Sequence, residues 1–407
     1  MSAGGEHTLR TTSDGTVHSA GACGLGWNRL AELNPSLFGW RKVELPETVS
    51  AKEGEQIASG YYHNLAIGQS GRLYSWGCGT FPDGAKNDGC IPGLGQGLAA
   101  LDRGSQPTPV LGLEKGERVS SVAAGAYHSV ALTPTGRVLT FGAAQLGQLG
   151  RSVTGSVQDA SGLPVDPLPR PVEGLPASEV PVRIGAGFYN TFVACESGQL
   201  YCSGENQNRQ CGIEVTSEAM NIPRMQRVAD LKGERVRHAQ GGYCHTLALL
   251  LDGRVLTMGC GDDGQRGDGI KPDAFRPPVT EARLGVQREP AEMIASGANH
   301  SVALTRSSKV YAWGSDEFGQ CGGGGEGGEV GGLVLTPQEV QLPPHAGRIV
   351  SVSAGYAHTV LRDDRGAVYV MGQNESGQLG LGGGSFKNPA DVRSLILSPF
   401  TKDFKTK

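Results

Sequence analysis

Short apolar runs alternate with polar, glycine-containing turns along most of this sequence. The segment 123–150 shows the pattern most clearly, because the apolar runs 130–132 and 138–141 flank a Pro-Thr-Gly turn at 134–136. Short apolar runs bounded by turn residues are typical of buried β-strands, so the segment predicts two strands joined by a tight turn. Ala-Gly-x-x-His precedes the first run, and Gly-Gln-Leu-Gly follows the second.

This unit recurs seven times, at intervals of 55 to 65 residues. Such intervals exceed those of two-helix solenoid repeats and suit four short strands with their loops, which make one blade of a β-propeller. The central motif position of the seven units is occupied by His7, His63, His128, Asn190, His245, His300 and His358. The second strands are predicted at 16–20, 73–76, 138–141, 200–203, 255–258, 310–313 and 368–371.

The two ends of the sequence complement each other. The first motif has no apolar lead-in, whereas the last turn signature is followed by a strand-like run, 390–397, with no motif after it. We therefore expect the N- and C-terminal strands to close one blade, which would leave no long open sheet edge. The predicted fold class for residues 1–407 is an all-β, seven-bladed β-propeller in a single domain, with long loops at 27–49, 81–105, 151–182 and 322–333.

Composition adds three constraints. Glycine accounts for 64 of 407 residues, which fits a chain with many turns. The formal net charge is −4, so no electrostatic attraction to nucleic acid or to an anionic membrane is expected. No apolar run approaches the roughly 20 residues of a membrane-spanning helix, so membrane insertion is not expected.

Nine cysteines are present, none of them in a Cys-x-x-Cys pair. Their odd number and spacing predict free, buried thiols in a reducing compartment. The first residues show neither the charged lead nor the apolar segment of a signal or transit peptide, which predicts a cytoplasmic protein. The ciliary and nuclear compartments are alternatives, and an organelle would require a presequence that had been removed. Cys195, Cys202 and Cys211 form the closest group, but no histidine lies at zinc-finger spacing from them, so no metal site is predicted.

Six of the seven units carry the motif histidine. Because a residue present in nearly every blade serves something that every blade needs, we interpret these histidines as packed groups that hydrogen-bond neighbouring strands. A pH-responsive ring is the alternative. Asn190 favours the first interpretation, since an amide donates and accepts like a neutral imidazole but does not titrate. The turn at 147–150 is not a phosphate loop, because no Gly-Lys-Ser/Thr follows it.

The two positions before the motif histidine vary between units, and aromatic residues occupy them in five units. Ring symmetry would bring these side chains to one face around the central channel. They either cap the channel and pack between blades or form a partner-binding surface, since aromatic residues with polar tips are common at contacts. The candidate contact residues are Tyr61, Tyr62, Tyr127, Phe188, Tyr189, Tyr243 and Tyr356. No catalytic, cofactor-binding or metal-binding residue is predicted.

Three motifs together resemble the repeats of the regulator of chromosome condensation family: Ala-Gly-x-x-His-Ser/Thr-x-Ala-Leu, Gly-x-Val-Tyr-x-Trp-Gly and Gly-Gln-Leu-Gly. The middle motif is carried closely by residues 74–77 and 311–314. The resemblance extends over nearly the whole chain and implies a seven-bladed β-propeller. It does not imply one function, because a fold shared by many activities must be interpreted at its sites.

The founding activity of that family is nucleotide exchange on a small nuclear GTPase, by a protein that docks on chromatin through a basic N-terminal tail. This sequence has no such tail, since Arg10 is its only cation before the second strand. Another relative senses ultraviolet light through clustered tryptophans at the two variable positions. None of those positions is Trp here, so a light sensor is not expected.

We therefore predict a non-enzymatic scaffold for protein–protein interaction, a subunit or assembly factor of a larger complex that needs no cofactor. Its expected partners are other proteins, without direct contact to nucleic acid. The alternative function is a guanine-nucleotide exchange factor, with a small GTPase as the partner and the insertion 81–105 as the candidate wedge.

Overall fold

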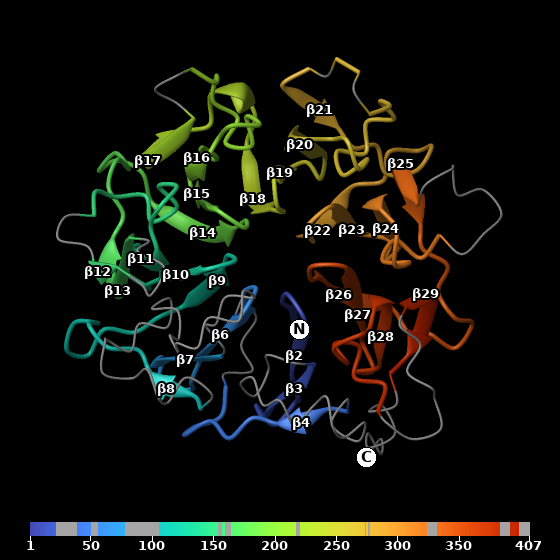
Figure 1. The fold of residues 1–407 in the computed structure, drawn as a ribbon, viewed down its shortest axis with the longest axis horizontal. Coiled ribbons are helices and arrows are strands. Elements are labelled where there is room, and N and C mark those ends of the chain that lie inside the picture. The colour runs from blue at the N-terminus through green and yellow to red at the C-terminus, as the bar shows by residue number, and fades with distance from the viewer. Residues whose placement is uncertain are drawn as a thin grey trace.

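Seven small antiparallel sheets stand in a ring around a central channel in the computed structural model (Figure 1). The structure describes residues 1–21, 39–49, 56–77, 106–153, 157–158, 164–216, 220–272, 274–275, 277–323, 332–382 and 391–398. Among these residues, six sheets have four strands and one has five. The all-β, seven-bladed propeller predicted from the sequence is confirmed.

Each sheet is one blade, and its strands run in chain order from the channel outward, except that β12 lies outside β13. Blades 1 and 2 contain β1 (Ser2–Ala3), β2 (His7–Thr11), β3 (Val17–Gly21) and β4 (Arg41–Lys42), then β5 (Ile57–Ser59), β6 (His63–Ile67), β7 (Leu73–Gly77) and β8 (Thr108–Pro109). Blades 3 and 4 contain β9 (Ser121–Ala124), β10 (His128–Leu132), β11 (Val138–Ala143), β12 (Val157–Gln158) and β13 (Pro164–Pro171), then β14 (Pro181–Ala186), β15 (Asn190–Cys195), β16 (Leu200–Glu205) and β17 (Asn221–Arg227). Blades 5 to 7 contain β18 (Val236–Gly241), β19 (His245–Leu250), β20 (Val255–Gly259) and β21 (Val279–Glu281), then β22 (Ala291–Ser296), β23 (His300–Thr305), β24 (Val310–Ser315) and β25 (Leu333–Glu339), then β26 (Ile349–Ala354), β27 (His358–Asp363), β28 (Val368–Gln373) and β29 (Asp391–Leu397).

The predicted hairpins form the middle of each blade. In blade 3, β10 pairs with β11 from His128 opposite Gly142 to Leu132 opposite Val138. Both strands are buried along their whole length, which explains why they read as nearly continuous apolar runs in the sequence. The predicted second strands correspond to β3, β7, β11, β16, β20, β24 and β28.

The hydrophobic core is divided into layers between neighbouring blades. Leu65 and Leu73 of blade 2 pack in one cluster with Val122, Leu139 and Phe141 of blade 3, and all five are almost fully buried. Burying an apolar side chain of this size stabilises a fold by about 1.5–3 kcal/mol. Each blade therefore depends on both of its neighbours for stability.

The prediction that the N- and C-terminal strands close one blade is wrong. β1 is the innermost strand of blade 1, whereas β29 is the outermost strand of blade 7 and pairs with β28. β29 corresponds to the outer strands of the other blades, such as β25 in blade 6. The lead-in that the first motif was expected to lack is present as β1, but it is only two residues long.

Blades 7 and 1 instead close the ring by side-by-side contacts. Tyr356 donates its backbone N–H to the carbonyl of Gly4 (3.0 Å), and Ala3 donates its N–H to Ser353 Oγ (2.9 Å). Farther from the channel, Trp40 Nε1 donates to Ser398 Oγ at 2.9 Å. The termini therefore lie in adjacent blades, and no sheet is shared between them.

The segment 151–182 is not the long loop that its prolines suggested. It contains β12, β13 and the first residues of β14. The prolines of β13 lie in the outer part of the blade, where a residue without a backbone N–H is tolerated. The predicted loop 81–105 and parts of the predicted loops 27–49 and 322–333 lie outside the described residues.

Candidate functional site

A ring of backbone hydrogen bonds joins the seven motif loops around the channel. In each loop, the first variable residue donates its N–H to the carbonyl of the equivalent residue in the next blade, or of the glycine before it. These bonds are 2.9 to 3.3 Å long, and the donors are Gly5, Tyr61, Ala126, Phe188, Tyr243, Ala298 and Tyr356. The main chain therefore holds these loops in place whatever side chains they carry.

The motif histidines form hydrogen bonds between strands, as the sequence predicted, and the joined strands belong to neighbouring blades. His128 Nε2 lies 2.9 Å from Thr191 Oγ1 in blade 4, and His300 Nε2 lies 3.0 Å from Thr359 Oγ1 in blade 7. The same contact joins His7 to Asn64, His63 to Ser129, His245 to Ser301 and His358 to Thr8, at 2.6 to 3.0 Å. Sequence reasoning missed these partners, although Ser or Thr directly follows the motif position in six of the seven units.

The hydroxyl partner determines the tautomer of the histidine. Thr191 donates its only hydroxyl proton to the carbonyl of Gln148 (2.7 Å), so it can only accept a hydrogen bond from His128 Nε2–H. Nδ1 of His128 consequently carries no proton and has no hydrogen-bond partner among the described residues. Burial lowers the pKa of His128 to about 4, and the pKa values of the other five motif histidines to about 3 or 4. The ring of histidines is therefore neutral at pH 7.

Blade 4 uses its motif position differently. Asn190 donates Nδ2–H to the carbonyl of Glu205 in its own blade at 2.6 Å. Thr246, which stands where the histidine partner would be, donates to the carbonyl of Gln210 at 2.7 Å. None of the described contacts joins Asn190 to Thr246, so the amide keeps the neutrality of the imidazole but not its link to the next blade.

The glutamine of the turn signature is also structural. Gln148 Oε1 accepts the N–H of Leu146 at 2.9 Å and so closes the turn from within. The same bond, at 2.9 to 3.0 Å, is made by Gln210, Gln265, Gln320 and Gln378. The glutamine side chain is thus engaged by a hydrogen bond within its own turn.

All seven aromatic candidates gather in one cluster at one end of the channel. Tyr61, Phe188 and Tyr356 come from blades 2, 4 and 7, and their ring centroids lie 5.4 to 6.1 Å apart. Because these blades stand at separate points of the circle, the three rings meet across the channel axis and close that end. The other four, Tyr62, Tyr127, Tyr189 and Tyr243, extend the cluster with centroid distances of 4.4 to 6.4 Å.

This aromatic cluster has a buried base and an exposed rim. Tyr62 is only 9% exposed, whereas Tyr243 is 49% exposed and Tyr356 is 39% exposed. Burial, followed by the neighbouring Tyr127 and Tyr243 hydroxyls, raises the pKa of Tyr189 to about 12. The Tyr189 phenol therefore stays protonated at neutral pH and can donate a hydrogen bond.

The expectation of free thiols is wrong for four of the nine cysteines. Cys202 is bonded to Cys211 within blade 4, and Cys244 is bonded to Cys260 at the same end of blade 5 as Tyr243. Cys202, within β16, meets Cys211 in the turn after that strand. Cys244 and Cys260 flank the paired strands β19 and β20, where His245 stands opposite Gly259. Cys195 and Cys321 are free and buried, and Cys23, Cys78 and Cys90 lie outside the described residues. Since disulfides persist in oxidising environments, the thiol argument for a reducing compartment no longer holds.

The two disulfides predict the number of free thiols per chain. Nine cysteines less the four paired ones leave at most five thiols per chain. Thiol titration of the unreduced, denatured protein should therefore give five or fewer, and reduction before the titration should give nine. Nine thiols without reduction would show that neither disulfide forms.

The described residues contain neither a metal-ligand cluster nor a membrane-spanning helix. Among the described residues, no group of three or more His, Cys, Asp or Glu side chains could hold a metal ion. The part of the chain that the structure describes also has no helix long and apolar enough to cross a membrane.

Comparison with known proteins agrees with this geometry. Residues 197–249, 252–304 and 307–361 match one description of the Regulator of chromosome condensation (RCC1) repeat, and 55–81, 119–148, 236–265 and 349–378 match a second. The class defined by the fold and its motif loops is the RCC1-repeat β-propeller. This chain belongs to the regulator of chromosome condensation repeat family.

The share of each relative's length that aligns with this chain differs between relatives. It is 30% identical to the ultraviolet-B receptor UVR8 of Arabidopsis thaliana over 94% of this chain and 78% of the receptor. It is 33% identical to protein pim1 of Schizosaccharomyces pombe over 64% of this chain, but spans only 46% of pim1. The crystal structure of Prp20p from Saccharomyces cerevisiae, with 22% identity, superposes with a TM-score of 0.67 over 84% of this chain and 76% of Prp20p. The similarity to Prp20p shows a shared fold.

Proposed function

We propose that this protein is a non-enzymatic scaffold that binds another protein through the aromatic cluster at the closed end of the channel. The supporting observation is that seven aromatic rings from five blades converge there, with Tyr243 and Tyr356 at an exposed rim. Exposed tyrosines combine a large apolar area with a polar tip, and they are over-represented among the residues that dominate binding energy.

Two blades indicate that the aromatic rings are not needed to build the propeller. Blade 1 carries Gly5 and Glu6 at the variable positions, and blade 6 carries Ala298 and Asn299. Both loops still make their bonds in the backbone ring. A requirement for packing would apply to every blade, so the aromatic rings in the other five blades serve a different purpose.

The arrangement suits a rigid subunit of a larger complex. The loops that carry the aromatic cluster are already held by interblade hydrogen bonds, so little conformational freedom remains to be lost on binding. The variable positions of blades 1 and 6, on either side of blade 7, carry no aromatic residue, so the cluster is asymmetric around the channel axis and gives a partner a defined orientation. A cytoplasmic location remains a prediction of the sequence.

The test of this function removes the exposed rim. Replacing Tyr243 and Tyr356 together with alanine should reduce capture of the native partner by about tenfold or more, since buried tyrosine anchors contribute on the order of 2 kcal/mol each at interfaces. The variant and the wild type would each be immobilised on beads and incubated with extracts of the native source. The bound proteins would then be quantified by mass spectrometry.

Phe275→Ala is the matched control. Phe275 is 91% exposed but lies outside the aromatic cluster, so its removal also deletes an exposed ring. A protein that is lost from the double variant and retained by Phe275→Ala is the expected partner. Identical sets of bound proteins for all three chains would disprove the proposal.

The alternative function, guanine-nucleotide exchange on a small GTPase, rests on family membership. Prp20p, which shares the fold, has binding properties toward Gsp1p and histones. The candidate wedge, residues 81–105, lies outside the described residues. Accelerated nucleotide release from any small GTPase by the purified protein would establish this function in place of the scaffold.

A further inference from the structure

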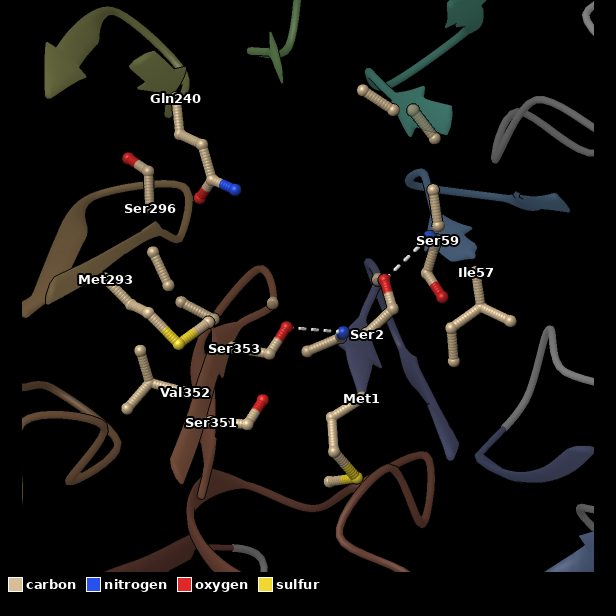
Figure 2. A pocket seen from close by; sticks show the side chains of 18 of the residues that line it. Met1, Ser2, Ile57, Ser59, Gln240, Met293, Ser296, Ser351, Val352 and Ser353 are labelled. Atoms are coloured by element: carbon tan, nitrogen blue, oxygen red, sulfur yellow. Dashed lines mark hydrogen bonds between the residues drawn. The ribbon is translucent and has the colours of Figure 1, made fainter. Parts of the chain in front are cut away.

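The central channel is a cavity of about 1000 Å³ that is closed at one end by Tyr61, Phe188 and Tyr356. Its walls are the inner strands, which present mostly small side chains. Figure 2 shows Ser59, Ser296 and Ser353 on the inner strands of three different blades that line it. The small side chains leave room for a ligand on the axis.

Four arginines line this cavity near its other end: Arg10, Arg183, Arg237 and Arg362. Arg183 lies five residues before Phe188, and a strand rises about 3.3 Å per residue, so it stands roughly 16 Å from the aromatic end. Arg237 lies in the corresponding part of β18. Arg10 and Arg362 lie near the ends of β2 and β27 that are farthest from the motif histidines. Arg183, Arg237 and Arg362 come from blades 4, 5 and 7 and are at least partly exposed at the opening. Arg10 of blade 1 is almost fully buried, with its guanidinium carbon 5.8 Å from the centre of the Trp40 ring.

The charges at this end are unbalanced. Arg365 also belongs to the described lining, but its guanidinium donates to the carbonyl of His345, outside the lining, at 3.2 Å. The other four arginines of the described lining stand against two carboxylates, Glu292 and Asp364. Asp364 already lies 3.8 Å from Arg348, as an ion pair outside the cavity lining. Arg183, Arg237 and Arg362 make no ion pair or side-chain hydrogen bond with any residue that the structure describes. This opening is thus cationic in a chain whose net charge is −4.

Two of these cations also lie near each other. Burial, and then the charge of Arg362, lowers the pKa of Arg10 to about 10. Arg10 is 2% exposed, so its charge is poorly screened by water.

We propose that the open end of the channel binds a compact small-molecule polyanion that carries several phosphate groups. The cations are arginines, whose planar guanidinium groups form paired hydrogen bonds with phosphate oxygens. A cavity closed at its far end accepts a compact molecule, whereas an extended chain would need an exit. The volume is at the upper end of the range of small-molecule sites, about 300–1,000 Å³. This site lies at the opposite end of the channel from the exposed aromatic rim and does not depend on the proposed function.

The experiment measures binding of myo-inositol hexakisphosphate to the full chain by titration calorimetry at low ionic strength. We expect binding at one site per chain, weakened by added salt. Arg183→Gln with Arg237→Gln, and separately Arg362→Gln, should each lower the affinity by at least about tenfold, since hydrogen bonds to charged groups contribute roughly 1.5–3 kcal/mol. Circular dichroism of each variant would verify that the ring is folded.

Arg306→Gln is the control, because Arg306 is exposed and lies outside the cavity. Binding that is retained by this control and lost by the channel variants supports the proposal. Absence of binding, or an equal loss with Arg306→Gln, would overturn the site. Tighter binding of an Asp-rich peptide than of the polyphosphate would overturn the ligand class, because it would assign the opening to an acidic segment of a protein.

Discussion

Acidification from pH 7 to about pH 4.5 is expected to unfold this protein, through protonation of its six motif histidines. In the folded ring, burial holds their pKa values at about 3 or 4, below the ordinary value of 6.5. Protonation would place a charge and an N–H at a buried Nδ1, which has no acceptor among the described residues for five of the six. The stabilising form of each histidine is therefore the neutral one.

The pH window follows from the sign of these shifts. Between pH 6.5 and about 4 the unfolded chain binds protons that the folded chain does not, so stability falls as the pH falls. Each histidine contributes up to about 1.4 kcal/mol per pH unit in this range. Six acting together would offset a typical stability of about 5–15 kcal/mol within two pH units.

Thermal unfolding followed by circular dichroism from pH 8 to pH 4.5 measures this effect. The midpoint should be nearly constant above pH 7 and fall steeply below pH 6.5, before most carboxylates titrate. His128→Asn should lower the number of protons taken up on unfolding by about one, and so make the fall of the midpoint with pH less steep. Asn190 shows that an amide is accommodated at this position. A midpoint that stays level down to pH 4.5 would show that the histidines are not held neutral by burial.

Gly125→Ala is expected to destabilise the protein by about 3 kcal/mol, because it overpacks a motif loop. A Cβ at this position would collide with the ring of His128 and with the carbonyl oxygen of Gly187 in the next blade. The ring could only move by giving up its hydrogen bond to Thr191. Chemical denaturation of the variant and the wild type measures the difference in free energy of unfolding.

Gly116→Ala separates this collision from a general effect of replacing glycine. Gly116 has a φ of +82° and no heavy atom within 4 Å of an added Cβ, so only backbone strain of about 1 kcal/mol is expected. Equal losses for the two variants would mean that the contact between Gly125 and the histidine ring does not hold the blades together.

The features that repeat could be predicted from the sequence. Seven copies of one motif implied seven blades, and symmetry alone placed Tyr61, Phe188 and Tyr356 on one face before any distance was known. The structural role of the histidines followed from their number. In each case, the prediction was possible because the same residue type recurs at the same motif position in successive units.

The features that do not repeat could not be predicted in this way. β1 was overlooked because two residues give no periodic signal, and the neighbouring blade supplies the contacts that hold them. The pairing of Cys202 with Cys211 depends on how the turn after β16 folds back. Arg183 and Arg362 converge on the channel from different strands of different blades, so their common position is a property of the closed ring.

The central claim is that recurrent side chains build the ring and that the aromatic cluster serves binding. The most direct measurement determines the thermal midpoint and the amount of partner captured on the same preparations of wild type and Tyr243→Ala/Tyr356→Ala. The account predicts a midpoint within about 3 °C of wild type, because the altered side chains are partly exposed, together with a loss of capture. A midpoint that falls as far as that of Gly125→Ala, with capture reduced only in proportion to the unfolded fraction, would contradict it.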